Sequence, residues 1–435
     1  MRLWEESTVQ NSTPFDQSFC RSSLSRVIGK RDFRGVPKAD QDTFREALLA
    51  QAIHSATVGF TLANQPLLSF PLKGKTVYRV GAKSDELVVR KLRLNLRMCS
   101  SSWLESRTQI VRCLSLLLEE GVPYRIYRLD IRSFYESFDQ SNVLKSISDL
   151  RRLSPQSKSL IANLLKCFSV MGGTGIPRGL AISATLSELM MHDFDVHVQR
   201  DDDTFFFARY VDDIIVVTSA REAATDFLAK VRSWLPAGLD FNPTKHDIAD
   251  TGGKLTRIDS ASAPLLLRLD YLGYQFTVRN PLKSDHKKDK DGELSRDVEI
   301  DISKKKLKKI KTRLVRSFLE FSKTGDWPLL KDRIAFLTQN FSVYNPMAGG
   351  KKIAGIFYSY PLTKECSPGL RDLDSFLRNA ALAKKGRVFT STSALLSGQQ
   401  RRALLKYSFV RGHANKSFVH FSPQRISKIQ RCWLY

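Results

Sequence analysis

Two apolar, β-prone runs separated by adjacent aspartates constrain the fold of this chain more than any other feature. Residues 204–218 read TFFFARYVDDIIVVT, with three phenylalanines before the acids and an aliphatic run after them. This pattern predicts a β-hairpin with Asp212 and Asp213 at its turn. Neighbouring carboxylates in a buried hairpin are costly unless a cation neutralises them, and carboxylate oxygens suit Mg²⁺ or Mn²⁺. An ordinary aspartate-rich β-turn is the alternative interpretation.

A second carboxylate follows a separate predicted strand. Residues 124–129 have strand character, and Asp130 comes directly after them, before Ile131 and the aromatic pair Phe134-Tyr135. Clamping two divalent ions about 3.5–4 Å apart requires a carboxylate that faces the aspartate pair from another strand. Asp130 is the candidate for that position.

The charge of the chain indicates a polyanionic partner. Its 435 residues carry 69 Lys and Arg against 44 Asp and Glu, which gives a formal net charge of +25. Nucleic acid is the simplest partner, and a membrane surface is the alternative. Because no apolar run reaches the roughly 18 residues of a membrane-spanning helix and the first residues show no signal-peptide core, we expect a cytoplasmic protein without a membrane partner.

Cysteine and histidine patterns argue against other chemistry. The six cysteines form no CxxC pair, which favours reduced thiols and no zinc site. The seven histidines form no HxH or HxxxH cluster, so histidine-based metal chemistry is not expected.

Hydrophobic periodicity predicts several further elements. Helices are expected over 41–70, 84–118, 141–170 and 180–198, a strand over 271–278, and an amphipathic lysine-rich helix over 303–321. The stretch 280–296 is charged and poor in apolar residues, so it reads as a linker or loop.

Three motifs, in order, resemble those of the reverse transcriptases. DIRSFY at 130–135 resembles their first palm motif, and YVDD at 210–213 resembles their YxDD motif. GIPRGLAIS at 175–183 is similar to the GxPxGxxxS motif between them. LDFNPTK at 239–245 and LDYLGYQ at 269–275 resemble the next palm motif and the primer grip. The resemblance covers roughly residues 70–320.

This resemblance implies an α+β right-hand polymerase fold with fingers, an antiparallel palm sheet with helices, and a helical thumb. It divides the chain into an N-terminal arm (1–40), fingers (41–123), a palm (124–280, with 141–200 partly shared with the fingers), a charged linker (281–298), a thumb (299–345) and a basic, mostly helical extension (346–435). The interleaved bases and aromatics of the last 35 residues suit single-stranded nucleic acid, and a solvated basic tail is the equal alternative.

The resemblance also assigns site residues. Two Mg²⁺ ions, with Mn²⁺ as an alternative, would be held by Asp130, Asp212, Asp213 and the carbonyl of Ile131. Nucleotide contacts fall to Lys73, Lys75, Arg79, Tyr135, Gly175, Pro177, Arg178, Gly179, Ser183 and Lys245. Nucleic-acid contacts fall to Lys304, Lys305, Lys308, Lys309, Lys311 and Arg313 on the lysine-rich helix.

Several of these roles have a competing interpretation. Tyr135 sits at the position of a steric gate against the ribose 2′-hydroxyl, and core packing is its alternative. Lys245 would be the acid for the leaving pyrophosphate, or simply a solvated lysine. Gly175 and Gly179 would allow close backbone approach to the nucleotide and template base.

Two departures point to a subgroup. Many relatives carry Gln where this chain has Arg178, and Pro where it has Ala184. Together with the stretch 180–188, they are most similar to the abortive-infection, defence-associated reverse transcriptases. That group implies antiphage action with a noncoding RNA, and a partner protein or homo-oligomer in some members.

Several alternatives stay open at this point. The chain would otherwise be an untemplated or protein-primed DNA polymerase of the same group, a retron or group II intron type, an RNA-dependent RNA polymerase, or a degenerate nucleic-acid-binding scaffold. Tyr135 and the YxDD form argue against the RNA polymerase, and the three acids argue against the scaffold. The residues do not identify template, primer, product or oligomeric state.

Overall fold

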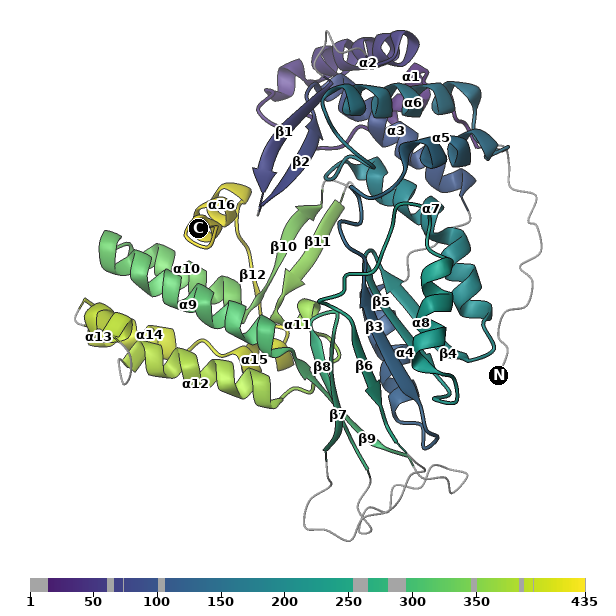
Figure 1. Cartoon of the computed structure of the whole chain (residues 1–435). Coiled ribbons are helices and arrows are strands. Elements are labelled where there is room, and N and C mark those ends of the chain that lie inside the picture. Colours follow the sequence, from purple (N-terminus) through teal and green to yellow (C-terminus); the bar gives the residue numbers. More distant parts are fainter. Residues whose placement is uncertain are drawn as a thin grey trace. The chain divides into compact units, whose positions relative to one another are not determined.

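The chain folds into two compact units (Figure 1). A computed structural model describes residues 15–60, 66–72, 74–100, 106–252, 265–280, 295–345, 350–382, 387–393 and 395–434. One unit comprises Met1–Leu104 and Ile126–Ile248, and the other comprises Glu105–Arg125 and Ala249–Tyr435. Both contain helices and antiparallel strand pairs, so the predicted α+β class is confirmed.

Helices supply most of the core of the first unit. They are α1 (Arg21–Ser25), α2 (Gln41–Val58), α3 (Lys83–Cys99), α5 (Gln140–Asp149), α6 (Pro155–Val170), α7 (Ala181–Arg200) and α8 (Ala224–Ser233), with a short 3₁₀ helix at Lys38–Asp40. Helix α6 has a well-capped start: the Ser154 hydroxyl accepts from the Ser157 amide, and Pro155 occupies the first turn. The long helix α7 packs against both α3 and β4.

Strands of the first unit form a hairpin and a sheet. The hairpin pairs β1 (Leu67–Leu72) with β2 (Lys75–Val80). The sheet has the order β4-β5-β3-β6, from β3 (Arg125–Asp130), β4 (Thr204–Tyr210), β5 (Asp213–Thr218) and β6 (Asp247–Asp250). The aliphatic run of β5 is completely buried, which explains why it reads as continuous rather than alternating.

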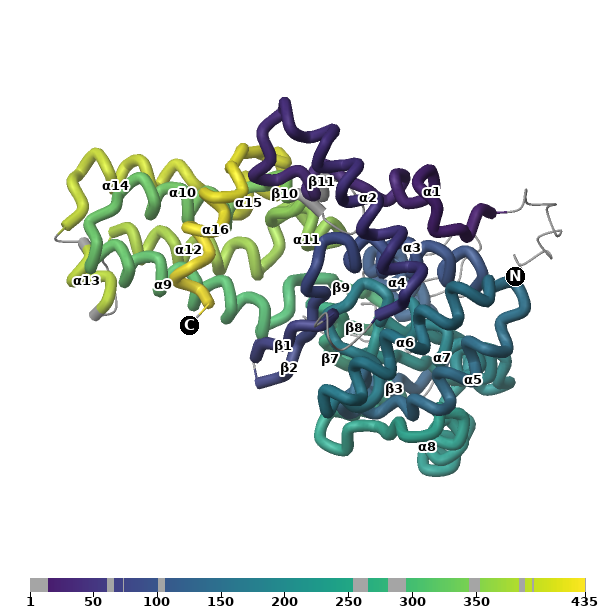
Figure 2. The backbone as a smooth tube through the Cα atoms, turned by 90° about the horizontal axis from the view of Figure 1, so that it is seen from above, coloured from purple at the N-terminus to yellow at the C-terminus, as the bar shows by residue number. Residues whose placement is uncertain are grey.

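The second unit combines two small sheets with a helical layer. Its helices are α4 (Arg107–Leu118), α9 (Lys304–Thr324), α10 (Trp327–Thr338), α11 (Ile356–Ser359), α12 (Pro368–Leu382), α13 (Arg387–Ser393), α14 (Gly398–Leu405), α15 (Phe409–Ala414) and α16 (Pro423–Arg431). Its strands are β7 (Leu265–Tyr271), β8 (Tyr274–Arg279), β9 (Asp297–Ile302), β10 (Asn340–Asn345), β11 (Gly350–Gly355) and β12 (Phe418–Val419). The sheets have the orders β7-β8-β9 and β11-β10-β12. Helices α9, α10 and α12 lie side by side (Figure 2).

Three of the expected elements differ from the structure. Helix α2 ends at Val58, where Gly59 takes a φ of +86°, and the residues from Leu67 form β1 instead of more helix. The expected helix over 84–118 is described as two helices, α3 and α4. The expected strand over 271–278 is interrupted, because Leu272 and Gly273 both adopt positive φ and turn the chain from β7 into β8.

No helix in the described ranges is both long enough and apolar enough to cross a membrane.

Candidate active site

The aspartate pair sits at a two-residue hairpin turn. Tyr210 at the end of β4 pairs with Asp213 at the start of β5, so Val211 and Asp212 form the turn itself. Val211 adopts a left-handed φ of +65°. Two-residue hairpins favour positive φ at the turn, although the residue that usually supplies it is Gly, Asn or Asp rather than a β-branched one. The hairpin predicted from the sequence is confirmed, with the acids at its end.

Asp130 is brought to the same end of the sheet. It is the last residue of β3, which lies next to β5. The amide of the following residue, Ile131, donates to the Asp212 carbonyl at 3.0 Å. One backbone hydrogen bond joins the end of β3 to the aspartate turn. The residues Asp130, Asp212 and Asp213 therefore lie at the same end of the sheet.

Burial and repulsion between carboxylates make Asp212 and Asp213 reluctant to ionise. Burial raises the pKa of Asp213 to about 6, and the charges of Asp212 and Asp130 add to that effect. Arg128 opposes it, with its Nε 3.7 Å from Oδ1 of Asp213. Burial is also the main cause that raises the pKa of Asp212, followed by repulsion from Asp130. A cluster of half-buried acids of this kind is stabilised by added positive charge.

Lys245 and Asn242 contact Asp130 directly. Lys245 Nζ lies 3.0 Å from Oδ2 and 3.2 Å from Oδ1 of Asp130, and Asn242 Nδ2 donates to Oδ2 at 3.3 Å. A tight turn places both residues, since the Lys245 amide donates to the Asn242 carbonyl at 3.1 Å. The structure therefore brings Lys245 to the site, where its partner is a carboxylate.

The carboxylate oxygens of the site suit a hard divalent cation, but they do not surround a single position for one. Across the described part of the chain, no three Asp, Glu, His or Cys side chains are gathered tightly enough to enclose a metal ion. Lys245 and Arg128 instead lie against Asp130 and Asp213. Ion binding would therefore require the acids to close in and Lys245 to leave Asp130. The amide of Ile131 contacts the turn, and the ligand role of its carbonyl stays a prediction.

Tyr135 and Arg178 form a second cluster beside the acids. The Arg178 guanidinium donates to Glu136 through Nε at 2.7 Å and Nη2 at 2.9 Å. Its centre lies 5.1 Å from the centroid of the Tyr135 ring. Tyr135 is half-buried, and burial raises its pKa. Glu136 is a contact that the motif pattern did not predict, and it takes up one edge of the Arg178 fork.

The glycine loop is held from two sides. Gly175 has a φ of +71°, and a Cβ there would overlap the Tyr135 carbonyl, to which the Ile176 amide donates at 2.7 Å. Gly179 has a φ of +106°, and a Cβ there would lie 2.6 Å from the Tyr78 carbonyl oxygen. The helix after the loop is attached by Ser183, whose hydroxyl donates to the Pro177 carbonyl at 2.6 Å.

The β1–β2 hairpin is attached to this loop. The Tyr78 amide donates to the Arg178 carbonyl at 2.7 Å. Lys75 begins β2 and is exposed, and the guanidinium of Arg79 lies 5.8 Å from the Phe70 ring centroid. Lys73, also predicted to contact the nucleotide, lies outside the described residues.

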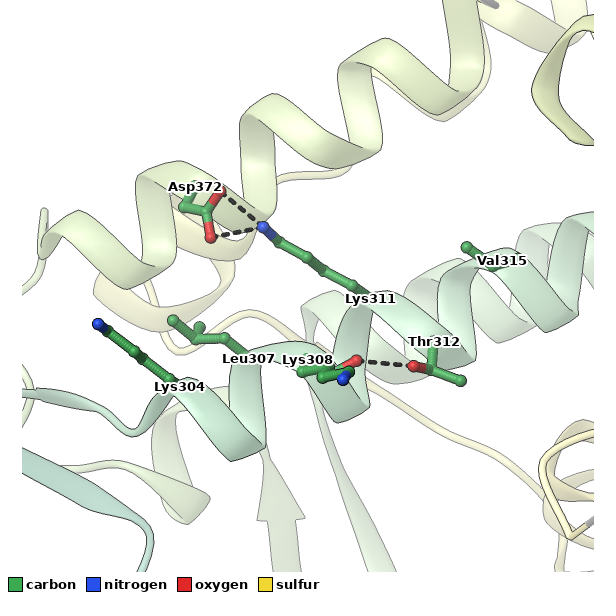
Figure 3. Close-up of a pocket in the computed structure, with 7 residues that line it drawn as sticks. All are labelled: Lys304, Leu307, Lys308, Lys311, Thr312, Val315 and Asp372. Carbon is green, nitrogen blue, oxygen red and sulfur yellow. Dashed lines mark hydrogen bonds and ion pairs between the residues drawn. The ribbon is translucent and has the colours of Figure 1, made fainter. Parts of the chain in front are cut away.

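Helix α9 of the second unit carries the predicted nucleic-acid contacts. Lys304, Lys305, Lys308 and Lys309 are exposed. A groove of about 400 Å³ runs between α9 and α12 (Figure 3), lined by Lys304, Leu307, Lys308, Lys311, Thr312, Val315 and Asp372.

Two of the predicted contacts on α9 already have protein partners. Lys311 pairs with Asp372 at 2.7 Å. The Arg313 guanidinium lies 5.2 Å from the Trp433 ring centroid, and burial lowers the pKa of Arg313. Arg313 therefore packs against the C-terminal segment rather than presenting its charge openly.

Sequence reasoning missed the residues that support the acids. Arg128, Glu136 and Arg209 all contact the site, and none lies inside one of the three motifs. The sequence did contain an indication of the role of Arg209. This charged residue lies between three phenylalanines and the aspartate turn, and a charge that becomes buried there needs an oppositely charged partner.

Comparison with protein-family models finds one match. Residues 109–276 match the family model described as reverse transcriptase (RNA-dependent DNA polymerase). The chain therefore carries a reverse transcriptase domain, which confirms the predicted enzyme class: an RNA-directed DNA polymerase domain, and hence a nucleotidyltransferase. No curated protein sequence matches the chain.

Matching solved structures include two telomerases. One is the apo telomerase of Candida tropicalis truncated from its C-terminal domain, at 14% identity and a TM-score of 0.32, over 53% of this chain and 58% of that one. The other is telomerase from Candida albicans in complex with a fragment of telomeric RNA, at 11% identity and a TM-score of 0.33, over 91% of this chain and 66% of that one. The chain thus spans less than two thirds of either.

Proposed function

We propose that this protein polymerises deoxynucleotides on an RNA template, with Asp130, Asp212 and Asp213 as the acids of a two-ion site. The observation that carries the proposal is the junction between β3 and the aspartate turn. The Ile131 amide bonds the Asp212 carbonyl at 3.0 Å, which holds acids from separate strands at one sheet edge. The match of residues 109–276 to the reverse transcriptase family supports the same reaction.

Asp130, Asp212 and Asp213 would hold Mg²⁺ or Mn²⁺, because carboxylate oxygens suit hard cations. The pKa values of Asp212 and Asp213 are raised by burial and by neighbouring carboxylates, and a bound cation would relieve that repulsion. When bound, the ions lower the pKa of a primer 3′-hydroxyl and offset charge on the phosphate under attack. Arg128 and Lys245 offset part of the repulsion among the acids. On release from Asp130, Lys245 would be free to donate a proton to the departing pyrophosphate.

Tyr135 and the glycine loop would position the incoming nucleotide. The ring of Tyr135 is half-buried and lies against the Arg178 guanidinium, and both contacts support a role as a steric gate. Gly175 and Gly179 let the loop approach Tyr135 and Tyr78 more closely than any side chain would permit. Lys75 and Arg79, on the attached hairpin, would face the triphosphate.

The exposed lysines of α9 would bind the phosphates of the template–primer. Lys304 and Lys308 line the groove together with the apolar side chains of Leu307 and Val315. Ammonium groups that line an apolar groove suit a sugar–phosphate backbone, and such binding weakens as salt rises.

A primer-extension assay tests the proposal. Purified protein, an RNA template with an annealed DNA primer, dNTPs and Mg²⁺ should give extended product. Asp212→Ala with Asp213→Ala should abolish incorporation while RNA binding persists. Normal incorporation by that double variant would sink the metal-site assignment. Tyr135→Ala should admit ribonucleotides, and unchanged sugar discrimination would assign Tyr135 to core packing.

We further propose an antiphage role with a noncoding RNA partner. Support comes from Arg178 and Ala184, which stand where many relatives have Gln and Pro, and from the net charge of +25. Cells that express the chain should lower phage plaque counts, and the double aspartate variant should not. Sequencing of copurified RNA and of the cDNA separates templated synthesis from the untemplated and protein-primed alternatives, because only templated cDNA matches a bound RNA.

A further inference from the structure

A buried arginine lies beside the turn that carries Asp212. Arg209 lies on β4, two residues before Val211, and it is only 7% exposed. A buried guanidinium destabilises a fold unless its charge and its donors are satisfied. The contacts of Arg209 therefore show what the fold gains from keeping it there.

Helix α7 supplies two acidic partners. Glu188 accepts from Nη1 at 3.0 Å and from Nη2 at 2.6 Å, and Asp195 accepts from Nε at 2.8 Å and from Nη2 at 2.6 Å. The two acids are seven residues apart, so they lie on one face of the helix, two turns from each other. Glu188 and Asp195 together accept hydrogen bonds from four of the five N–H donors of the guanidinium, and one donor is left for another acceptor.

The remaining donor goes to the turn itself. Arg209 Nη1 donates to the Val211 carbonyl at 3.2 Å. Val211 has a φ of +65°, which is unfavourable for a β-branched residue and persists only where the surroundings impose it. The carbonyl that Arg209 holds belongs to the peptide group that leads directly into Asp212.

We propose that Arg209 is a positioning residue for the acids of the active site: clamped by Glu188 and Asp195, it holds the Val211 peptide left-handed and so orients Asp212. The inference rests on the proposed function, because it assigns to Arg209 the support of a divalent-ion site. Through α7 the same clamp is continuous with Ser183, which secures the glycine loop at Pro177.

A half-buried arginine that also pairs with two acids offers a control. Arg90 on α3 pairs with Asp32 through Nη1 at 2.8 Å and Nη2 at 2.9 Å, and with Glu86 at 2.6 Å. Like Arg209, it bridges two acids within the first unit, and it has no contact with the turn among its described bonds. A lysine at either position keeps the positive charge but lacks the planar set of N–H donors that lets arginine bond two acids at once.

The test measures binding of Mn²⁺ to the full chain by electron paramagnetic resonance, without nucleotide or nucleic acid. Arg209→Lys should weaken Mn²⁺ binding about 10–100-fold, the usual effect of losing a group that orients metal ligands. In primer extension it should lower kcat and leave the KM for dNTP unchanged. Arg90→Lys should leave Mn²⁺ binding at the wild-type level.

Rescue separates orientation from general stability. In the Arg209→Lys background, Val211→Gly should restore part of the Mn²⁺ affinity, because glycine adopts positive φ without imposed support. If Arg209→Lys does not fold, Asp195→Asn, which removes one charged acceptor at nearly constant shape, should weaken Mn²⁺ binding in the same direction.

Three outcomes would overturn the inference: unchanged Mn²⁺ affinity in a folded Arg209→Lys protein, an equal loss in Arg90→Lys, or no recovery with Val211→Gly. A different result marks failure of the proposed function. If Asp212→Ala with Asp213→Ala binds Mn²⁺ as tightly as the wild type, the ion site itself is misassigned and the inference falls with it.

Discussion

The ammonium of Lys245 lies 3.0 Å from the carboxylate of Asp130, a residue 115 positions earlier in the chain. This pair places a protein cation on one of the acids that the proposed reaction needs for a metal ion. Lys245 and a divalent cation therefore compete for the same oxygens.

Removing Lys245 should tighten binding of a divalent ion. The Lys245 side chain is 61% exposed, so its pairing with Asp130 is worth at most about 1 kcal/mol, and Lys245→Met should raise Mn²⁺ affinity by up to about fivefold. Mn²⁺ titration measures this effect. Lys230, on α8, pairs with Asp201 away from the site, and Lys230→Met serves as a matched lysine control. Weaker Mn²⁺ binding in Lys245→Met would show that the two cations do not compete.

Gly179→Ala should destabilise the first unit more than an ordinary glycine substitution at positive φ. Gly172 has a φ of +78° and open space where a Cβ would stand, so Gly172→Ala should cost only the left-handed conformation, about 1–2 kcal/mol. At Gly179 the new Cβ also meets Val77 and Tyr78, which adds overlap with β2. Urea unfolding of both variants measures the difference, and equal losses would contradict the close approach described for the loop.

Arg178 and Glu136 should be energetically coupled. Their side chains are 28% and 33% exposed and joined by two hydrogen bonds, so a double-mutant cycle with Arg178→Gln and Glu136→Gln should give a coupling energy of roughly 0.5–1 kcal/mol. The cycle is read from the free energy of unfolding. A coupling energy of zero would contradict this and would mean that Arg178 can leave Glu136 without a cost in free energy.

Cys20 should be the most reactive thiol of the described cysteines. Hydrogen bonds from Ser18 and Ser22 lower its pKa to about 6, whereas burial raises the pKa of Cys167 and Cys432. Because a thiol with a lowered pKa keeps its thiolate as the pH falls, Cys20 should still be alkylated rapidly near pH 6.5. Mass spectrometry after brief iodoacetamide treatment locates the modified residue. Cys20→Ser is the control, and faster labelling of Cys167 would contradict the assignment.

The local patterns of the sequence were enough to predict the strands and the turn that carry the three candidate acids. Alternating and continuous apolar runs encode strands through burial, so the hairpin around Asp212 and the strand ending at Asp130 follow from neighbouring residues alone. Gly175 and Gly179 both adopt positive φ, and the close approach to a nucleotide and template base expected of them stays a prediction. The helix expected over 41–70 ends at Val58 in the structure, and the residues from Leu67 pair with β2 instead. The helix propensity of single residues does not show where a strand finds its partner.

Only the tertiary structure decided which charges meet. Arg178 pairs with Glu136, Lys245 with Asp130, and Arg209 with Glu188 and Asp195, and each pair joins separate elements. Sequence determines which residues are charged and where strands and turns form, because those properties depend on neighbours in the chain. Coulombic and hydrogen-bond partners act over a few ångströms in space, so they are set only when packing brings distant segments together.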